Sequence, residues 1–413
     1  MKRNLLSLLF ILATLGLVMI FAFSNSELSN AWGALFTLDL KWLLAALAGW
    51  FAYMAFDMLS LHYFLRKQKH GIAMNSSCYV TLIGFYYSNI TPGASGGQPM
   101  QVYYLSKRGV PVPIGTSAIS TKFFAQQLMI VLLSTVFWLT NASFVDAHLG
   151  ALRWAIYIGY AINFASIPLI LLVALHRPLV QAIVTFLIRL GAKLRLSKHP
   201  EETIVRVSAG LDVYHASILR LAKHPRQIIW MLVLAGLSVM GLMSVPCFVY
   251  HAFRMSGTPW YQLVTLGFLL FVSASYTPLP GASGAQEGGF LAFFNGMFTQ
   301  GTIGLALLVW RFFTYYLFLL VGAFISIAGH LRGSRFTTRE KRDAVPAGTV
   351  TAEAAAGAPA ADAVVETGAV TYDEAVRAMD AGILAADALF GTSGGIPAND
   401  ALREVADAKP SAD

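Results

Sequence analysis

Two cations lie inside apolar segments of this sequence, and each follows a copy of one short motif. The motif is PGASGGQ at Pro92–Gln98 and PGASGAQ at Pro280–Gln286, so six of its seven residues are identical. Lys122 and Arg311 follow the fifth residue of their copies by 26 and 27 residues, and each begins a cation-Phe-Phe triplet. Ammonium and guanidinium groups bind phosphates and carboxylates, so the pair predicts an anion-binding site.

The repeated motif is expected to interrupt a helix, because glycine adopts positive φ angles and proline lacks a backbone N–H. The helix that follows each break would direct its partly positive N-terminus at the same place as the cations. Four polar side chains of the motif are expected to line a cavity there or to satisfy the broken backbone: Ser95, Gln98, Ser283 and Gln286. The residues assigned to the breaks themselves are Pro92, Gly93, Gly96, Pro280, Gly281 and Gly284.

Two acids accompany these cations. Asp57 lies in an apolar segment of its own, and we expect it to pair with Lys122 or Arg311; a proton-coupling role is the alternative. Glu287 falls in the first turn of the helix after the second motif, where a carboxylate favours the helix dipole. A structural role is therefore favoured for Glu287 too, with proton carriage as the alternative. The cations bind substrate in one interpretation and merely hold the bundle together in the other.

The composition predicts that a membrane positions these residues. Hydrophobic residues make up 56% of the 413 positions and charged residues only 12%, against about 25% charged in soluble domains. The basic residues concentrate in the apolar part, 22 Lys and Arg against 8 acids in residues 1–332, which argues against a nucleic-acid partner. The segments long enough to cross the bilayer are Leu5–Phe23, Trp42–Leu65, Pro113–Leu139, Leu152–Leu175, Gln227–Phe253 and Thr302–His330.

Two further apolar stretches, Ile72–Ile90 and Tyr261–Tyr276, each run into one of the breaks. The predicted fold is therefore an all-α polytopic membrane protein with six full transmembrane helices plus two re-entrant helical hairpins. The hairpins and the cation-bearing spans form inverted repeats, about 72–139 and 261–330, a common plan in transporters. Each cation would lie about 13 Å into its span, near the middle of a hydrocarbon core about 30 Å thick.

Lys and Arg fix the expected orientation. With both hairpins treated as re-entrant, seventeen basic residues fall on the side of the N-terminus and three on the other, which makes that side cytoplasmic. If both hairpins were instead full transmembrane spans, the basic amphipathic loop 176–226 would face the outside, against the positive-inside rule. We therefore expect a cell-membrane protein with both termini cytoplasmic and the first span retained as an anchor rather than cleaved as a signal peptide. We expect residues 333–413 to form a disordered cytoplasmic tail of low complexity, separate from the membrane domain 1–332.

The sequence offers no catalytic motif, metal-ligand spacing or cofactor fingerprint, so none of the three is assigned. Its two cysteines lie apart in apolar segments, which disfavours a disulfide framework or zinc site. The expected partners are membrane lipids, with an anionic headgroup at the cations. The oligomeric state stays open.

The paired Pro-Gly-Ala-Ser-Gly-x-Gln breaks, the Lys/Arg-Phe-Phe spans and the basic middle loop resemble the flippase-like membrane domain of the lysylphosphatidylglycerol synthase family. The resemblance covers about residues 1–332 and implies movement of a lipid or lipid-linked headgroup between leaflets. Only 81 residues follow Arg332, too few for the family's aminoacyltransferase domain. The alternatives are a membrane subunit or transferase of lipid modification, with a separate enzyme as partner, and a small-solute transporter.

Overall fold

The computed structural model describes residues 33, 36–193, 200–275, 277–299 and 301–326. The first predicted span, Leu5–Phe23, and the tail 333–413 lie outside these residues. The chain divides into two compact units, residues 1–181 with 207–341, and residues 182–206 with 342–413. The helical bundle described below belongs to the first unit.

The described residues form helices and no strand, which confirms the all-α prediction. Five helices are long and apolar enough to cross a membrane, and they coincide with five of the six predicted spans. Two of the five are built from consecutive helical segments. They comprise α3 (Leu40–Lys67), α6 (Val112–Thr140), α8 (Arg153–Leu175), α11 (Pro225–Met243) continued by α12 (Val245–Ala252), and α15 (Ile303–Arg311) continued to Ser326.

Each break separates two shorter helices that fold back on one another. In the first copy α4 (Met74–Ile90) meets α5 (Gly97–Ser106), with Gly84 packed against the Gln101 side chain. In the second copy α13 (Trp260–Ala274) meets α14 (Ala285–Phe293), with Gly289 against Leu270. The 15 residues of α13 extend about 22 Å, less than the hydrocarbon thickness of about 30 Å.

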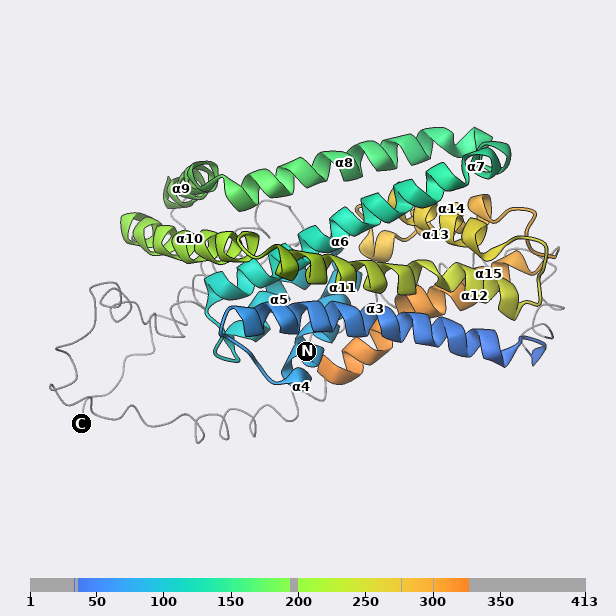
Figure 1. Ribbon diagram of the computed structural model, residues 1–413, viewed down its shortest axis with the longest axis horizontal. Helices are drawn as coiled ribbons and strands as arrows, with labels where there is room; N and C mark the ends of the chain where they lie inside the picture. Colours follow the sequence, from blue (N-terminus) through green and yellow to red (C-terminus); the bar gives the residue numbers. More distant parts are fainter. Residues whose placement is uncertain (1–32, 34–35, 194–199, 276, 300, 327–413) are drawn as a thin grey trace, which may run out of the picture. The chain divides into compact units, whose positions relative to one another are not determined.

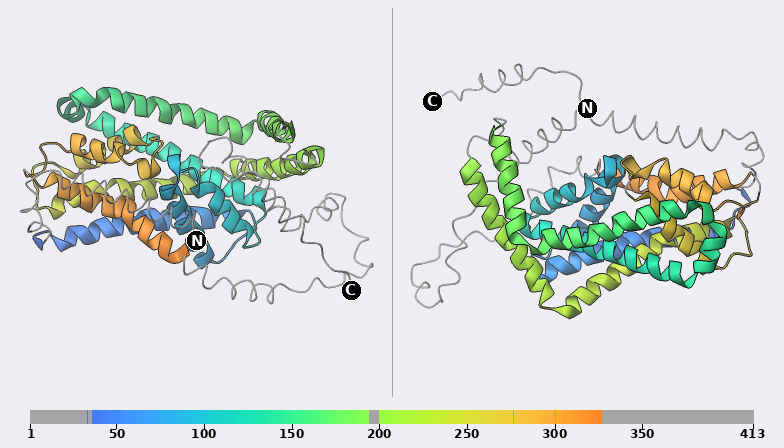
Figure 2. Two further views of the ribbon diagram at one scale, coloured as in Figure 1. Left: turned by 180° about the vertical axis from the view of Figure 1, so that it is seen from behind. Right: turned by 90° about the horizontal axis from the view of Figure 1, so that it is seen from above.

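The two hairpins open at opposite ends of the bundle (Figure 1). Thr265, near the start of α13, bonds to Asn141 at the end of α6, and the Asp39 N–H donates to the Ala252 carbonyl at the end of α12. At the other end, Leu65 and Leu105, close to the end of α3 and of α5, share one hydrophobic cluster. Figure 2 shows the same arrangement from behind and from above. The inverted repeats and the re-entrant placement of the hairpins in a membrane stay predictions.

The basic residues follow this division. The end where α4 and α5 open carries the turns that contain Arg66, Lys67, Lys69, Lys107 and Arg108. The end where α13 and α14 open carries only Lys41, Arg153 and Arg254 among the described Lys and Arg residues of the bundle.

Small residues allow the long helices to approach closely, as is usual between helices in membranes. A Cβ atom on Gly49 of α3 would lie 2.7 Å from the Gly241 carbonyl of α11, and one on Gly159 of α8 would lie 2.5 Å from the Val272 carbonyl of α13. A short helix, α7 (Ala142–His148), and the 3-10 turn η2 (Gly150–Leu152) connect α6 to α8.

The predicted amphipathic segment 176–226 forms α9 (Arg177–Lys193) and α10 (Pro200–Ala222). Their apolar residues are gathered on one face more strongly than those of α3, α6, α8 and α11, as expected of helices that lie along a membrane surface.

Candidate functional site

The two breaks begin with the same unusual backbone. Pro92–Ala94 (η1) and Pro280–Ala282 (η3) each form a single 3-10 turn. Gly93 has φ 58° and Gly281 has φ 60°, in the left-handed region that glycine enters without strain. The alanine after each glycine is also left-handed, with φ 55° in the first copy and 51° in the second. The identical sequences therefore fold identically over these residues.

The two breaks meet each other. The Gly93 N–H donates to the Pro278 carbonyl at 3.1 Å, which joins the first break to the residues before the second. Tyr315, beyond Arg311 on the last described span, donates its hydroxyl to the Asn89 carbonyl at 3.3 Å. The Tyr315 ring also fills the space beside Gly281, where an added Cβ would lie 2.2 Å from it. The contact between the repeats therefore depends on a glycine and an aromatic ring.

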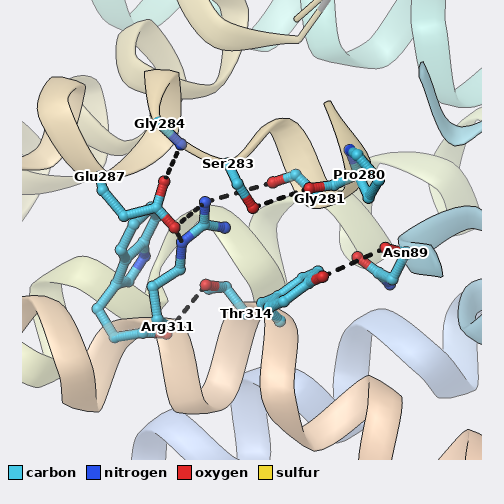
Figure 3. A network of polar contacts seen from close by, with 10 residues as sticks. Asn89, Pro280, Gly281, Ser283, Gly284, Glu287, Arg311 and Thr314 are labelled. Atoms are coloured by element: carbon cyan, nitrogen blue, oxygen red, sulfur yellow. Dashed lines mark hydrogen bonds and ion pairs between the residues drawn. The ribbon is translucent and has the colours of Figure 1, made fainter. Parts of the chain in front are cut away.

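Arg311 joins α15 to the second break (Figure 3). Its Nε and Nη2 lie 2.7 and 2.6 Å from Glu287 Oε1, and Nη2 also donates to the Gly281 carbonyl at 3.3 Å. Glu287 Oε2 accepts the Gly284 N–H at 2.6 Å, so one carboxylate pairs with the cation and caps the returning helix α14. Both side chains of the ion pair are buried, with 4% and 6% exposed.

Lys122 forms a corresponding pair with an acid from a different element. Its Nζ lies 2.8 Å from Asp57 Oδ2 of α3, and both residues are buried. The sequence allowed either Lys122 or Arg311 as the partner of Asp57, and in the structure the partner is Lys122. Asp57 Oδ1 is buried and accepts no hydrogen bond from the described residues. An unmatched carboxylate oxygen in a buried ion pair is unusual.

A π-helical turn, η4 (Phe312–Tyr316), follows Arg311 directly. Such turns carry one more residue than an α-helical turn and recur at functional sites. The centre of the Arg311 guanidinium lies 5.4 Å from the Tyr315 ring, so the two side chains stay together beside the second break.

A cavity of about 530 Å³ lies between the repeats. Lys122 and Arg311 line it, whereas their acids Asp57 and Glu287 do not. Each cation therefore has the cavity on one side and its carboxylate on another. Apart from Tyr53 of α3, its polar lining comes from both copies and consists of Ser88, Asn89, Ser95, Gln98, Gln101, Lys122, Gln126, Gln127, Ser275, Thr277, Gln286, Arg311 and Thr314.

The cavity contains part of the predicted site. Besides the cations, it is lined by Ser95, Gln98, Gln286, Gly93 and Gly281. Ser283 is absent from the lining; it is buried and donates its hydroxyl to the Pro280 carbonyl at 2.8 Å, so it supports the break. The other break residues outside the lining are Pro92, Gly96, Pro280 and Gly284.

Sequence reasoning missed several cavity residues. Gln126 and Gln127 lie about one turn after Lys122, and carboxamides in so apolar a span are a signal that a helical projection would have found. Gln101 lies one turn after Gln98 on the returning helix. The contact of Tyr315 with Asn89 joins residues 226 positions apart, and no local pattern indicates it.

Neither metal chemistry nor thiol chemistry is evident at this site. Among the described residues, no three His, Cys, Asp or Glu side chains are grouped closely enough to hold a metal ion. Cys247 is buried in the hydrophobic core around α12 and α13, away from the cavity lining.

Comparison with known proteins agrees with this architecture. Residues 4–322 match the family described as the lysylphosphatidylglycerol synthase TM region. The chain is also 25% identical over 286 residues to a UPF0104 membrane protein of Archaeoglobus fulgidus, an alignment that spans 65% of this chain and 80% of that protein. The family match includes both breaks, both cations and their acids. The chain is therefore a multi-pass membrane protein that belongs to the family of the lysylphosphatidylglycerol synthase transmembrane region.

Proposed function

We propose that this protein moves a lipid with an anionic headgroup between the two leaflets. The observation that supports this most is the cavity between two opposed helix breaks, with Lys122 and Arg311 on its wall and their acids outside it. Opposed repeats with broken helices that meet inside the membrane are a common plan in transporters. A mid-depth polar cavity suits a headgroup, whose passage through hydrocarbon is otherwise costly.

The ion pairs moderate the charge of this cavity. Two cations and two carboxylates sum to zero, so the cavity wall is locally positive without leaving uncompensated charge in the bilayer. Donors nevertheless remain for an incoming phosphate. Lys122 has three N–H groups and directs one at Asp57, and Arg311 Nη1 makes no hydrogen bond within the described part of the chain. Binding by such partly engaged donors is reversible, as transport requires.

The distribution of basic residues gives the proposed orientation. The end of the bundle that carries Arg66, Lys67, Lys107 and Arg108 would face the cytoplasm under the positive-inside rule. The first hairpin then opens to the cytoplasm and the second to the outside of a cell membrane. Both chain termini would be cytoplasmic if the first predicted span crosses once.

The experiment is leaflet exchange in proteoliposomes. The purified chain is reconstituted with phosphatidylglycerol that carries a fluorophore on an acyl chain, and an impermeant quencher reports the fraction of lipid in the outer leaflet. We expect exchange at least tenfold faster than in protein-free vesicles. Exchange at the protein-free rate would contradict the proposal.

A cavity variant and a matched control separate transport from folding. Gln98→Leu removes a carboxamide from the cavity wall at the first turn of α5, where the side chain is exposed and holds no helix in place. Gln262→Leu makes the same change on α13 outside the cavity lining. We expect at least a fivefold slower exchange for Gln98→Leu and an unchanged rate for Gln262→Leu, at equal reconstitution. Equal rates for both would indicate that the cavity is not the route.

A further inference from the structure

The charged lining of the cavity is of one sign. Lys122 and Arg311 are the charged residues of its wall, and no Asp or Glu lines it in the described part of the chain. The remaining polar wall consists of carboxamides and hydroxyls. Five glutamines contribute: Gln98, Gln101, Gln126, Gln127 and Gln286.

This composition discriminates between headgroups. A buried ammonium group needs an anionic partner, and without one its desolvation is poorly compensated. Asp57 and Glu287 are the nearby acids, but each already pairs with a cation of the cavity wall and lies outside the lining. An amine entering the cavity would therefore meet two like charges and no carboxylate on the described cavity wall.

Hydroxyl groups meet a different environment in the same cavity. A carboxamide donates through its NH₂ and accepts through its carbonyl oxygen, and a hydroxyl does both, so neutral polyols find complementary partners at any orientation. Gln98 and Gln286 occupy equivalent first-turn positions on the two returning helices and line the cavity from both repeats. The donors of Lys122 and Arg311 that the acids leave available suit the phosphate.

We propose that the cavity selects a phosphate ester of an uncharged polyol, such as a glycerol or sugar headgroup, over headgroups that carry an amine. For a lipid headgroup, this selectivity rests on the proposed movement of lipids between the leaflets. The phosphate contacts Lys122 and Arg311, and the polyol hydroxyls contact the carboxamides of both copies. The same chemistry describes a soluble polyol phosphate, so the test includes both sources.

The test compares lipids that differ only in the headgroup. Phosphatidylglycerol, phosphatidylinositol, phosphatidylethanolamine and aminoacylated phosphatidylglycerol carry the same acyl-chain fluorophore in the same proteoliposomes. We expect exchange of the two polyol lipids to be at least tenfold faster than exchange of the two amine-bearing lipids. Equal rates for all four would overturn the selectivity and leave lipid movement intact.

The remaining outcomes separate the two proposals. Uptake of radiolabelled glycerol phosphate without exchange of any lipid would support the polyol phosphate chemistry and overturn the lipid as its source. No exchange of any lipid and no uptake would overturn both proposals together.

A charge introduced into the wall tests the physical cause. Gln98→Glu places a carboxylate in the cavity, at a first-turn position where the helix dipole favours it. We expect the rate ratio of phosphatidylglycerol to phosphatidylethanolamine to fall at least tenfold, while Gln262→Glu outside the cavity leaves it unchanged. Ser95→Asp, on the exposed tip of the first break, is the second variant and should act in the same direction. An unchanged ratio in both cavity variants would overturn the proposal.

Discussion

The two copies of the broken-helix unit share a motif but stabilise it with different side chains. In the second copy Glu287 caps the returning helix and pairs with Arg311, so the break and the cation form one network. In the first copy the Gly96 N–H donates to Thr91 Oγ1 from the preceding side of the break, at 2.9 Å. The cation Lys122 takes its acid from α3, outside the hairpin.

A small sequence difference accounts for the different side chains that stabilise the two breaks. Pro99 directly follows the first motif and Glu287 directly follows the second, so the first returning helix offers no carboxylate at this position. The backbone adjusts accordingly. Gly96 is right-handed with φ −81°, whereas Gly284 has φ 86° at the equivalent position. Each copy thus keeps one acid for each cation and one acceptor for the break, although their sources differ.

The comparison predicts that the second copy is the more sensitive to loss of its acid. Glu287→Gln leaves Arg311 buried without a countercharge and weakens the cap at Gly284, and breaking a buried pair from one side costs about 3–5 kcal/mol. Thermal unfolding in detergent, followed with a thiol-reactive dye at buried Cys247, measures the loss. The double variant Glu287→Gln with Arg311→Gln should recover at least half of it. No recovery would show that the charge is not the cause.

Removal of the first-copy acid should have a smaller effect. Asp57→Asn deprives Lys122 of its partner, but Asp57 accepts a single hydrogen bond from Lys122 and caps no break, whereas Glu287 also holds the Gly284 N–H. We expect a destabilisation near the lower end of the range of about 3–5 kcal/mol for one-sided loss of a buried pair. The same unfolding assay measures it. A loss larger than that of Glu287→Gln would reverse the proposed ranking of the two copies.

Replacement of the equivalent glycines by alanine should also destabilise the second copy more than the first. Gly281→Ala combines left-handed strain of about 1–2 kcal/mol with a collision against the Tyr315 ring. Gly93→Ala carries the strain alone, because no atom lies within 4 Å of the position of its added Cβ. We expect the Tm of Gly281→Ala to fall clearly below that of Gly93→Ala. Equal values would show that Tyr315 does not pack against the break as described.

Much of the fold could be predicted because its signals are local. Apolar length predicted five described spans, and the repeated Pro-Gly motif predicted both breaks. The site was accessible only in part. Lys122 and Arg311 were identified because charge is rare in a span, but their division between Asp57 and Glu287 depends on how helices distant in sequence pack. The contact between Tyr315 and Asn89 depends on the assembly of both repeats, which residue spacing does not encode.

The smallest predicted effect concerns the hydroxyl that supports the first break. Thr91→Val removes the acceptor of the Gly96 N–H, and a lost cap of this kind costs about 1 kcal/mol. Thr116→Val is the matched control, since the exposed Thr116 hydroxyl bonds only to the Val112 carbonyl of its own helix, and its effect should stay within about 0.5 kcal/mol. The second copy has Leu279 where the first has Thr91, and there Glu287 accepts the Gly284 N–H. If Thr91→Val is as harmless as Thr116→Val, the first break does not depend on its own cap, and the contact of Gly93 with Pro278 must hold it instead.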